Sequence, residues 1–98
     1  MEVEPDELRQ AVERLHRCRA TLREVVPVAE QFKGETVWEG IVHVFDVSDN
    51  PTATTCYAWS SPVEGSDRRR FYAVLKTPPI NSPEQAVRAS ILSDVRQS

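Results

Sequence analysis

The chain has 98 residues, of which 40% are hydrophobic and 28% are charged, and both fractions lie close to the globular average. A chain of this length supports one hydrophobic core and not two, so we expect a single domain over residues 1–98. The formal net charge of -3 disfavours a dedicated nucleic-acid binder, because phosphate contacts require clustered positive charge.

The first residues, Met1 to Pro5, form an acidic tail over residues 1–5 without an apolar stretch. Secretory signals need an apolar segment, and transit peptides are rich in arginine and poor in acidic residues. No apolar run in the chain approaches the roughly 20 residues of a membrane-spanning helix. We therefore expect a cytoplasmic protein.

Apolar residues between Asp6 and Lys33 recur at alternating steps of three and four, which is the period of one helix face. The pattern predicts a long helix over residues 6–33. Pro27 has no N–H group and its ring crowds the preceding turn, so we expect a kink or break near Pro27. Lys33 and Gly34 are typical of a helix C-terminus. The apolar positions are Leu8, Ala11, Leu15, Cys18, Leu22, Val25, Ala29 and Phe32.

The segment over residues 35–77 changes to a period of two and is rich in β-branched and aromatic residues, which is typical of strands. Turn-forming clusters around Asn50 and Gly65 divide the segment into three strands, expected at residues 36–47, 53–60 and 70–76. Short connections favour antiparallel neighbours, because parallel strands need long crossovers. The segment therefore predicts a three-stranded antiparallel β-meander.

The end of the chain predicts a C-terminal helix over residues 83–96. Pro78 and Pro79 end the last strand, because neither can donate to a strand ladder. Ser82, Pro83 and Gln85 then match a capping box, with an N-cap hydroxyl, a proline at the first helical position and an amide at the third. The resulting fold class is α+β in the order α-β-β-β-α, with both helices packed on one face of the meander.

Alternation along the three strands predicts two apolar sheet faces, of which two helices on one side would cover only one. The uncovered face would be unusually apolar for a monomer and should be buried against something. We expect it to mediate homodimerisation or the binding of a protein partner, and the alternative is that the first helix or a tail folds over it. Its residues are Trp38, Val42, Val44, Tyr57, Trp59, Tyr72 and Val74.

The sequence contains no convincing pattern for catalysis, a metal or a cofactor, and we expect no catalytic residue, metal site, cofactor or small-molecule substrate. Four zinc-type ligands are present, but without the closely spaced pairs of structural zinc sites. Glu39 and His43 point to one side of a strand, yet four strand residues separate their backbones by about 13 Å. The potential zinc ligands are His16, Cys18, His43 and Cys56, and both cysteines are expected to be reduced core thiols.

Arginine clustering leaves nucleic-acid binding as an alternative function. The candidate contacts are Arg68, Arg69, Arg70 and Lys76, beside sheet aromatics that could stack on bases. The expected element order is similar to that of the double-stranded-RNA-binding domain. That resemblance stops at topology, because this chain has Pro83 and Glu84 where that family places a lysine cluster. The leading expectation is a non-catalytic protein-interaction module.

Overall fold

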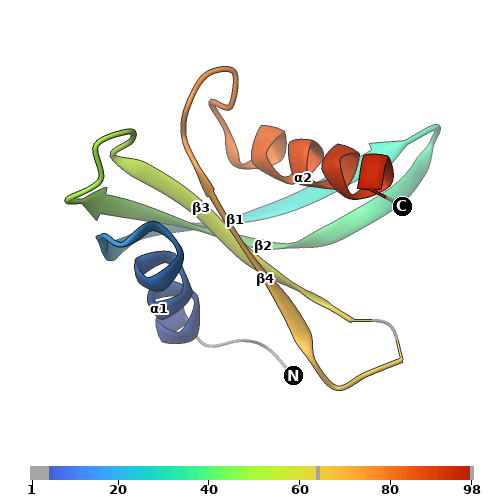
Figure 1. The fold of residues 1–98 in the computed structure, drawn as a ribbon. Helices are drawn as coiled ribbons and strands as arrows, with labels where there is room; N and C mark the ends of the chain where they lie inside the picture. The colour runs from blue at the N-terminus through green and yellow to red at the C-terminus, as the bar shows by residue number, and fades with distance from the viewer. Residues whose placement is uncertain (1–4, 64, 98) are drawn as a thin grey trace.

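The computed structural model describes residues 5–63 and 65–97. Its elements are α1 (Pro5–His16), β1 (Arg19–Phe32), β2 (Glu35–Ser48), β3 (Thr55–Pro62), β4 (Arg69–Leu75) and α2 (Pro83–Gln97). The strands form a four-stranded antiparallel sheet in chain order (Figure 1). The α+β class is confirmed, with one strand more than predicted. Residues 1–4 of the predicted acidic tail lie outside the described residues, and Pro5 begins α1.

The long N-terminal helix predicted over residues 6–33 is wrong, because α1 ends at His16 and most of the remaining segment is strand β1. Arg17 adopts a φ of 49°, and the N–H of Cys18 donates to the carbonyl of Glu13 at 3.3 Å. This hydrogen bond, spanning five residues, is the closure by which a left-handed residue ends a helix. The helix therefore stops although apolar residues continue at helical spacing.

Local preferences explain why the following residues form a strand. β1 contains three valines and a threonine, whose branched side chains favour strands over helices. Pro27, predicted to kink a helix, instead lies within β1 opposite Ile41, and an edge strand tolerates a missing N–H. Lys33 and Gly34 do not end a helix. Their φ angles of 52° and 81° form the tight turn between β1 and β2, of the kind that joins antiparallel strands.

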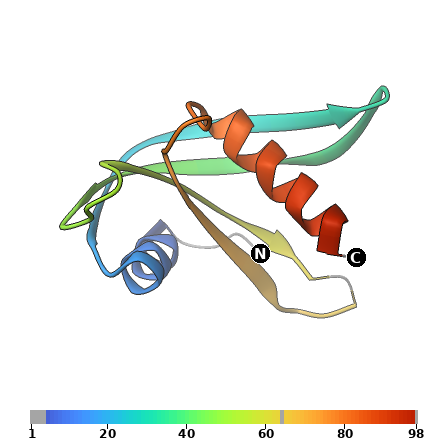
Figure 2. The same cartoon turned by 45° about the horizontal axis from the view of Figure 1, so that its top comes forward.

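The predicted meander corresponds to β2, β3 and β4, whose bounds lie close to those expected. β1 and β2 pair from the Arg19–Ser48 pair to the Phe32–Glu35 pair, whereas β2 and β3 pair only from His43–Ala58 to Asp46–Thr55. The two hairpins therefore diverge beyond His43 like the arms of a V (Figures 1 and 2). We call them the β1–β2 arm and the β3–β4 arm, and the region where β2 pairs with β3 is the vertex.

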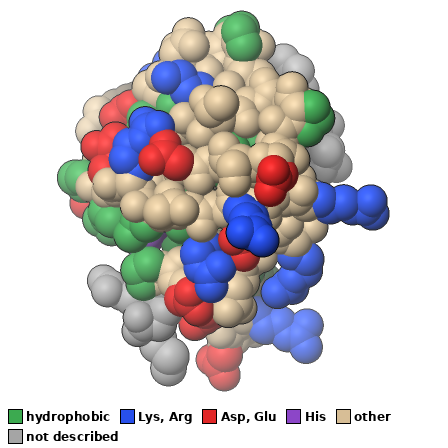
Figure 3. Space-filling view, turned by 90° about the vertical axis from the view of Figure 1, so that its left-hand side faces the viewer, with side chains coloured by type: hydrophobic (Ala, Val, Ile, Leu, Met, Phe, Trp, Pro, Cys, Tyr) green, Lys and Arg blue, Asp and Glu red, His purple; other side chains and the backbone are tan. Residues whose placement is uncertain are grey.

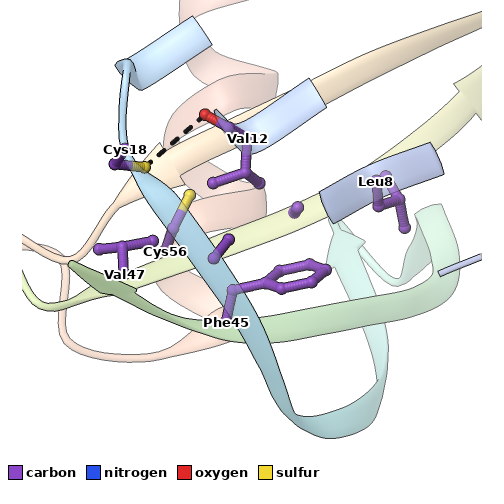
Figure 4. Packing of buried hydrophobic residues seen from close by; sticks show 8 residues of the cluster. Leu8, Val12, Cys18, Phe45, Val47 and Cys56 are labelled. Carbon is purple, nitrogen blue, oxygen red and sulfur yellow. Dashed lines mark hydrogen bonds between the residues drawn. The ribbon is translucent and has the colours of Figure 1, made fainter. Parts of the chain in front are cut away.

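The helices lie on opposite faces of the sheet, so the prediction that both pack on one face is wrong. Leu8 and Val12 of α1 pack on the face that carries Phe45 and Cys56 (Figure 4). Ala86 and Val87 of α2 pack on the other face, against Val42, Val44, Tyr57 and Trp59. Figure 2 shows α2 lying across the opening between the two arms. The faces are called the α1 side and the α2 side below.

The predicted start of the C-terminal helix is confirmed. Ser82 Oγ accepts a hydrogen bond from the N–H of Gln85 at 3.2 Å, and Gln85 Oε1 accepts one from the N–H of Asn81 at 2.6 Å. The hydroxyl and the amide thus satisfy backbone donors at the helix start, as a capping box does. Within the described part of the chain, neither helix combines the length and the apolar character needed to cross a membrane.

Candidate functional site

The predicted interaction face is assembled as expected but is covered by α2. Its seven residues belong to one cluster with Ala86 and Val87 of α2. Trp59 is 2% exposed and Tyr57 is 4% exposed, so neither offers a surface to a partner. The face is therefore covered within the chain, but by the C-terminal helix and not by the first helix or a tail.

A row of aromatic rings crosses the α2 side from arm to arm. Trp38 meets Trp59 edge-to-face with ring centroids 6.2 Å apart, and Trp59 stacks on Tyr72 at 5.1 Å. Trp38 Nε1 also donates to Ser61 Oγ at 2.9 Å, which joins β2 to β3 beyond the point where their ladder ends. The position of Trp38 depends on Gly40, because a Cβ atom there would lie 2.7 Å from Trp38 Cζ2.

A cleft of about 490 Å³ lies between the two arms, within the size range of ligand-binding clefts. It is lined by residues from both arms and from the start of α1, which places it on the α1 side with Trp38 among its walls. Most of the lining is apolar. The apolar lining residues are Pro5, Leu8, Val25, Trp38, Ile41 and Pro62.

His43 lies at the vertex, where the last β2–β3 pair joins it to Ala58, and it lines the cleft. The side chain is 9% exposed, and its Nδ1 has no hydrogen-bond partner among the described residues. Burial lowers the pKa of His43 from its ordinary value of 6.5, because desolvation disfavours the charged imidazolium. At neutral pH His43 is therefore a neutral imidazole in the wall of the cleft, and its unpaired Nδ1 is buried.

The two walls of the cleft carry opposite charges. Glu39 lies on the β2 wall and Arg69 on the β3–β4 wall. Arg69 Nε donates to Ser60 Oγ at 2.8 Å, and its Nη2 donates to the Ser60 carbonyl at 3.3 Å. These bonds fix the guanidinium on its own arm. A ligand with both donors and acceptors would match the pair better than a purely anionic or cationic one.

The arrangement does not assemble a catalytic group among the residues that the structure describes. Ser60 and His43 both line the cleft, but Ser60 Oγ accepts from Arg69 and no hydrogen bond joins the hydroxyl to His43 in the described part. A nucleophile requires such contact with its base. Glu39 and His43 share the cleft, but the strand between them is regular in its pairing with β1. Their backbones therefore keep the separation of about 13 Å expected for a strand.

The four zinc-type ligands do not come together. His16 Nε2 lies 2.8 Å from the carbonyl oxygen of Ala73, whereas Cys18 and Cys56 are free thiols in the core beneath α1. Burial raises the pKa of Cys56 to about 12. Among described residues, no group of three His, Cys, Asp or Glu side chains is placed to hold a metal ion.

An exposed apolar surface extends from the cleft along the α1 side of the β1–β2 arm. Register places Val25 opposite His43, Pro27 opposite Ile41 and Ala29 opposite Glu39, and partners in a pair share a face. Val25 is 47% exposed and Ile41 44%, and Pro27 and Ala29 are exposed as well. In Figure 3, hydrophobic side chains gather at the left-hand margin of the view. We call this surface the arm strip, formed by Val25, Pro27, Ala29 and Ile41.

The predicted nucleic-acid contacts do not form one patch. Arg69 and Arg70 are successive strand residues, so they point to opposite faces. Arg69 is held by Ser60, and the Arg70 guanidinium lies over the Tyr72 ring at 5.1 Å. Lys76 follows the far end of β4, about 20 Å along the strand from Arg70. Arg68 lies in the loop before β4, and the central aromatics that could have stacked on bases lie beneath α2.

Sequence reasoning missed the cleft, because the cleft exists only where the β1–β2 arm and the β3–β4 arm diverge. The helix predicted over residues 6–33 includes Val25, and the predicted interaction face does not include Ile41. Only the short ladder between β2 and β3 shows that these residues are exposed. Comparison with protein-family models, with curated proteins and with solved structures found no match to this chain.

Proposed function

We propose that this protein is a non-catalytic protein-interaction module that binds its partner through the arm strip and the adjoining cleft. The observation that supports the proposal is the continuous run of exposed apolar side chains on the α1 side of the β1–β2 arm. Exposed apolar patches of this kind mark interaction surfaces in monomeric domains. The earlier expectation of an interaction module is retained, and the surface assigned to it changes.

The strip has the composition of an interface core. Apolar side chains form its centre, and the charged side chain of Glu39, the partner of Ala29, lies beside them on the same face. Interfaces characteristically combine an apolar centre, poor in charge, with a polar rim. α1 cannot cover this surface, because it packs against the vertex residues Phe45 and Cys56 instead.

The proposal is tested with a strip variant that combines Val25→Ser and Ala29→Asp. The matched control is Leu92→Ser on α2, because Leu92 is also an exposed apolar residue, at 51%, but lies off the strip. Sedimentation velocity over a concentration series measures self-association, and quantitative affinity capture from cell extract measures other partners. We expect the strip variant to lose the association and the Leu92→Ser variant to keep it.

Two results would contradict the proposal. One is an association that the strip variant retains at wild-type strength. The other is the absence of both self-association and capture for the wild-type protein. Self-association that the strip variant alone abolishes would identify a second copy of this chain as the partner.

A further inference from the structure

The inner edge of β2 beside the cleft has no paired strand. The ladder between β2 and β3 ends at the pair His43–Ala58, although β2 begins eight residues earlier, at Glu35. Before His43 in the chain, β2 belongs to the β1–β2 arm, from which β3 diverges (Figure 2). An unpaired strand edge presents a row of N–H and C=O groups, and such a row is a template for another strand.

The backbone groups of Ile41 and Glu39 point into this gap. Pro27 lies opposite Ile41 in β1 and has no N–H to donate, so the pair is not a hydrogen-bonded one and Ile41 directs its N–H and C=O away from β1. Val47 also directs its N–H away from β1, because this N–H donates to the Thr54 carbonyl on the β3 side at 3.0 Å. The direction repeats every second residue, so Glu39 shares it.

The opposite wall of the gap is already engaged. Ser60 lies two residues beyond Ala58, the β3 partner of His43, so its backbone groups face the same gap. The Ser60 carbonyl accepts from Arg69 Nη2 at 3.3 Å, and the Ser60 hydroxyl accepts from Arg69 Nε at 2.8 Å. Within the described residues, the β2 edge is therefore the more open of the two.

We propose that the cleft binds an extended peptide segment of another protein, which adds a strand to β2 at Ile41 and Glu39. The inference rests on the proposed function and names the kind of partner and its mode of binding. In strand addition, main-chain hydrogen bonds supply affinity and alternate side chains supply specificity. A peptide backbone offers donors and acceptors together, which matches the two unpaired residues of β2.

The walls of the cleft specify an alternating peptide sequence. Peptide residues opposite Ile41 and Glu39 would direct their side chains to the α1 side, toward Leu8 and Pro62 in the apolar lining. The residue between them, opposite Gly40, would face the ring of Trp38, which already approaches within 2.7 Å of the position of a Gly40 Cβ. We therefore expect large apolar residues to alternate with glycine, alanine or serine.

The first test selects phage-displayed random peptides on the wild-type protein and measures hydrogen exchange in the complex. We expect the enriched peptides to show the alternating pattern and to slow exchange at the amides of Ile41 and Glu39. The amide of Gly40, which points toward β1, serves as the internal control and should change little. Failure to enrich any peptide, or protection confined to other segments, would overturn the proposal.

The second test uses the pair Ile41→Pro and Ile41→Ala. Both remove the apolar side chain, but only the proline removes the N–H that faces the gap, and that N–H contributes nothing to the β1 ladder. We expect Ile41→Pro to weaken binding of a selected peptide by about tenfold more than Ile41→Ala, the effect of one lost hydrogen bond with an unpaired partner. Equal affinities of the two variants would contradict strand addition.

A third measurement does not depend on how Ile41→Pro folds. The selected peptide is synthesised with single N-methyl groups at successive positions and titrated against the wild-type protein. Methylation should abolish binding at alternate positions and leave the intervening positions nearly unaffected, and a uniform response would overturn the proposal. If the strip variant loses a partner while these tests fail, the interaction function stands and only the strand-addition mode is wrong.

Discussion

The two faces of the sheet are both apolar, but they are buried to different extents. On the α2 side, large residues such as Trp59 and Tyr57 are buried under the C-terminal helix. On the α1 side, small residues such as Cys56 and Ala58 let α1 approach the vertex closely, while Val25 and Ile41 of the same face are exposed. The difference between the faces lies in the placement of the helices and not in hydrophobicity.

Helix length explains why the coverage is incomplete. α1 has 12 residues and spans about 18 Å, whereas the 14 residues of β2 extend over about 46 Å. A helix of this size protects the vertex or an arm, but not both. α2 lies between the arms and protects the aromatic row, so the arm strip on the α1 side is the part left to solvent.

Trp59→Ala gives the largest expected effect, because the ring is 2% exposed and contacts both Trp38 and Tyr72. Loss of a buried aromatic side chain costs about 3–5 kcal/mol, a large part of the stability of a small domain. We expect urea unfolding followed by circular dichroism to show a strongly reduced free energy of unfolding. The control is Val25→Ala on the arm strip, where the side chain is 47% exposed and we expect a loss of less than about 1 kcal/mol. Equal losses would remove the distinction between the faces.

Gly40→Ala tests the seating of Trp38 between the arms. The added Cβ atom would lie 2.7 Å from Trp38 Cζ2, so the ring must shift and its hydrogen bond to Ser61 is strained. We expect a loss of about 1–3 kcal/mol in the free energy of unfolding, typical of overpacking.

The control for this prediction is a double-mutant cycle with Trp38→Ala. If the collision with the indole causes the loss, Gly40→Ala should cost much less once the indole is absent. The same cost in both backgrounds would show that Gly40 matters for another reason.

Ser82→Ala weakens α2 without altering any apolar contact. The variant removes the hydroxyl that accepts from the N–H of Gln85, and loss of such an N-cap costs about 1 kcal/mol. We expect faster hydrogen exchange in α2 and unchanged exchange in α1. Ser93→Ala, at an exposed position inside the same helix, serves as the control and should not destabilise the protein. Equal acceleration in both helices would contradict independent coverage of the two faces.

His43 gives the smallest expected effect, a pH dependence of stability. Burial lowers the folded-state pKa below the ordinary value of 6.5, so the unfolded chain binds the proton more readily. The contribution of His43 to the free energy of unfolding is therefore fully present above pH 6.5. It decreases as the pH falls through 6.5 toward the lower pKa of the folded state. Comparison of wild type and His43→Phe by urea unfolding should show a weaker decrease in the variant, and identical pH profiles would exclude His43 as the cause.

Much of the second half of the fold could be predicted from local signals. The alternation along β2 from Trp38 onward, and along β3 and β4, correctly divided the residues between two faces. The capping residues around Ser82 correctly marked the start of α2. These features depend on neighbours in the sequence. The face of the sheet on which α2 packs does not depend on such local signals, because the path of the chain after β4 determines it.

The first half was predicted less well for a different physical reason. Between Arg17 and Phe32, the spacing of apolar residues favoured a helix, whereas valine and threonine favoured a strand. Arg17 adopts a left-handed backbone conformation that ends α1, and the strand forms after it. Such a conformation is uncommon for a residue other than glycine. The cleft depends on where β3 leaves β2, and nothing in the local sequence of His43 or Ala58 indicates that departure.

Pro27 has a consequence for how the molecule behaves in a crowded solution. β1 is a 14-residue edge strand, a length at which lateral stacking of copies into fibrils becomes a hazard. In the middle of that edge the pyrrolidine ring replaces an outward N–H, and register shifts near Leu22 and Glu30 interrupt the edge on either side. The outer edge of the sheet, β1, is thereby protected against the addition of further copies. The inner edge of β2 lies inside the cleft, where it is accessible only to a single extended strand.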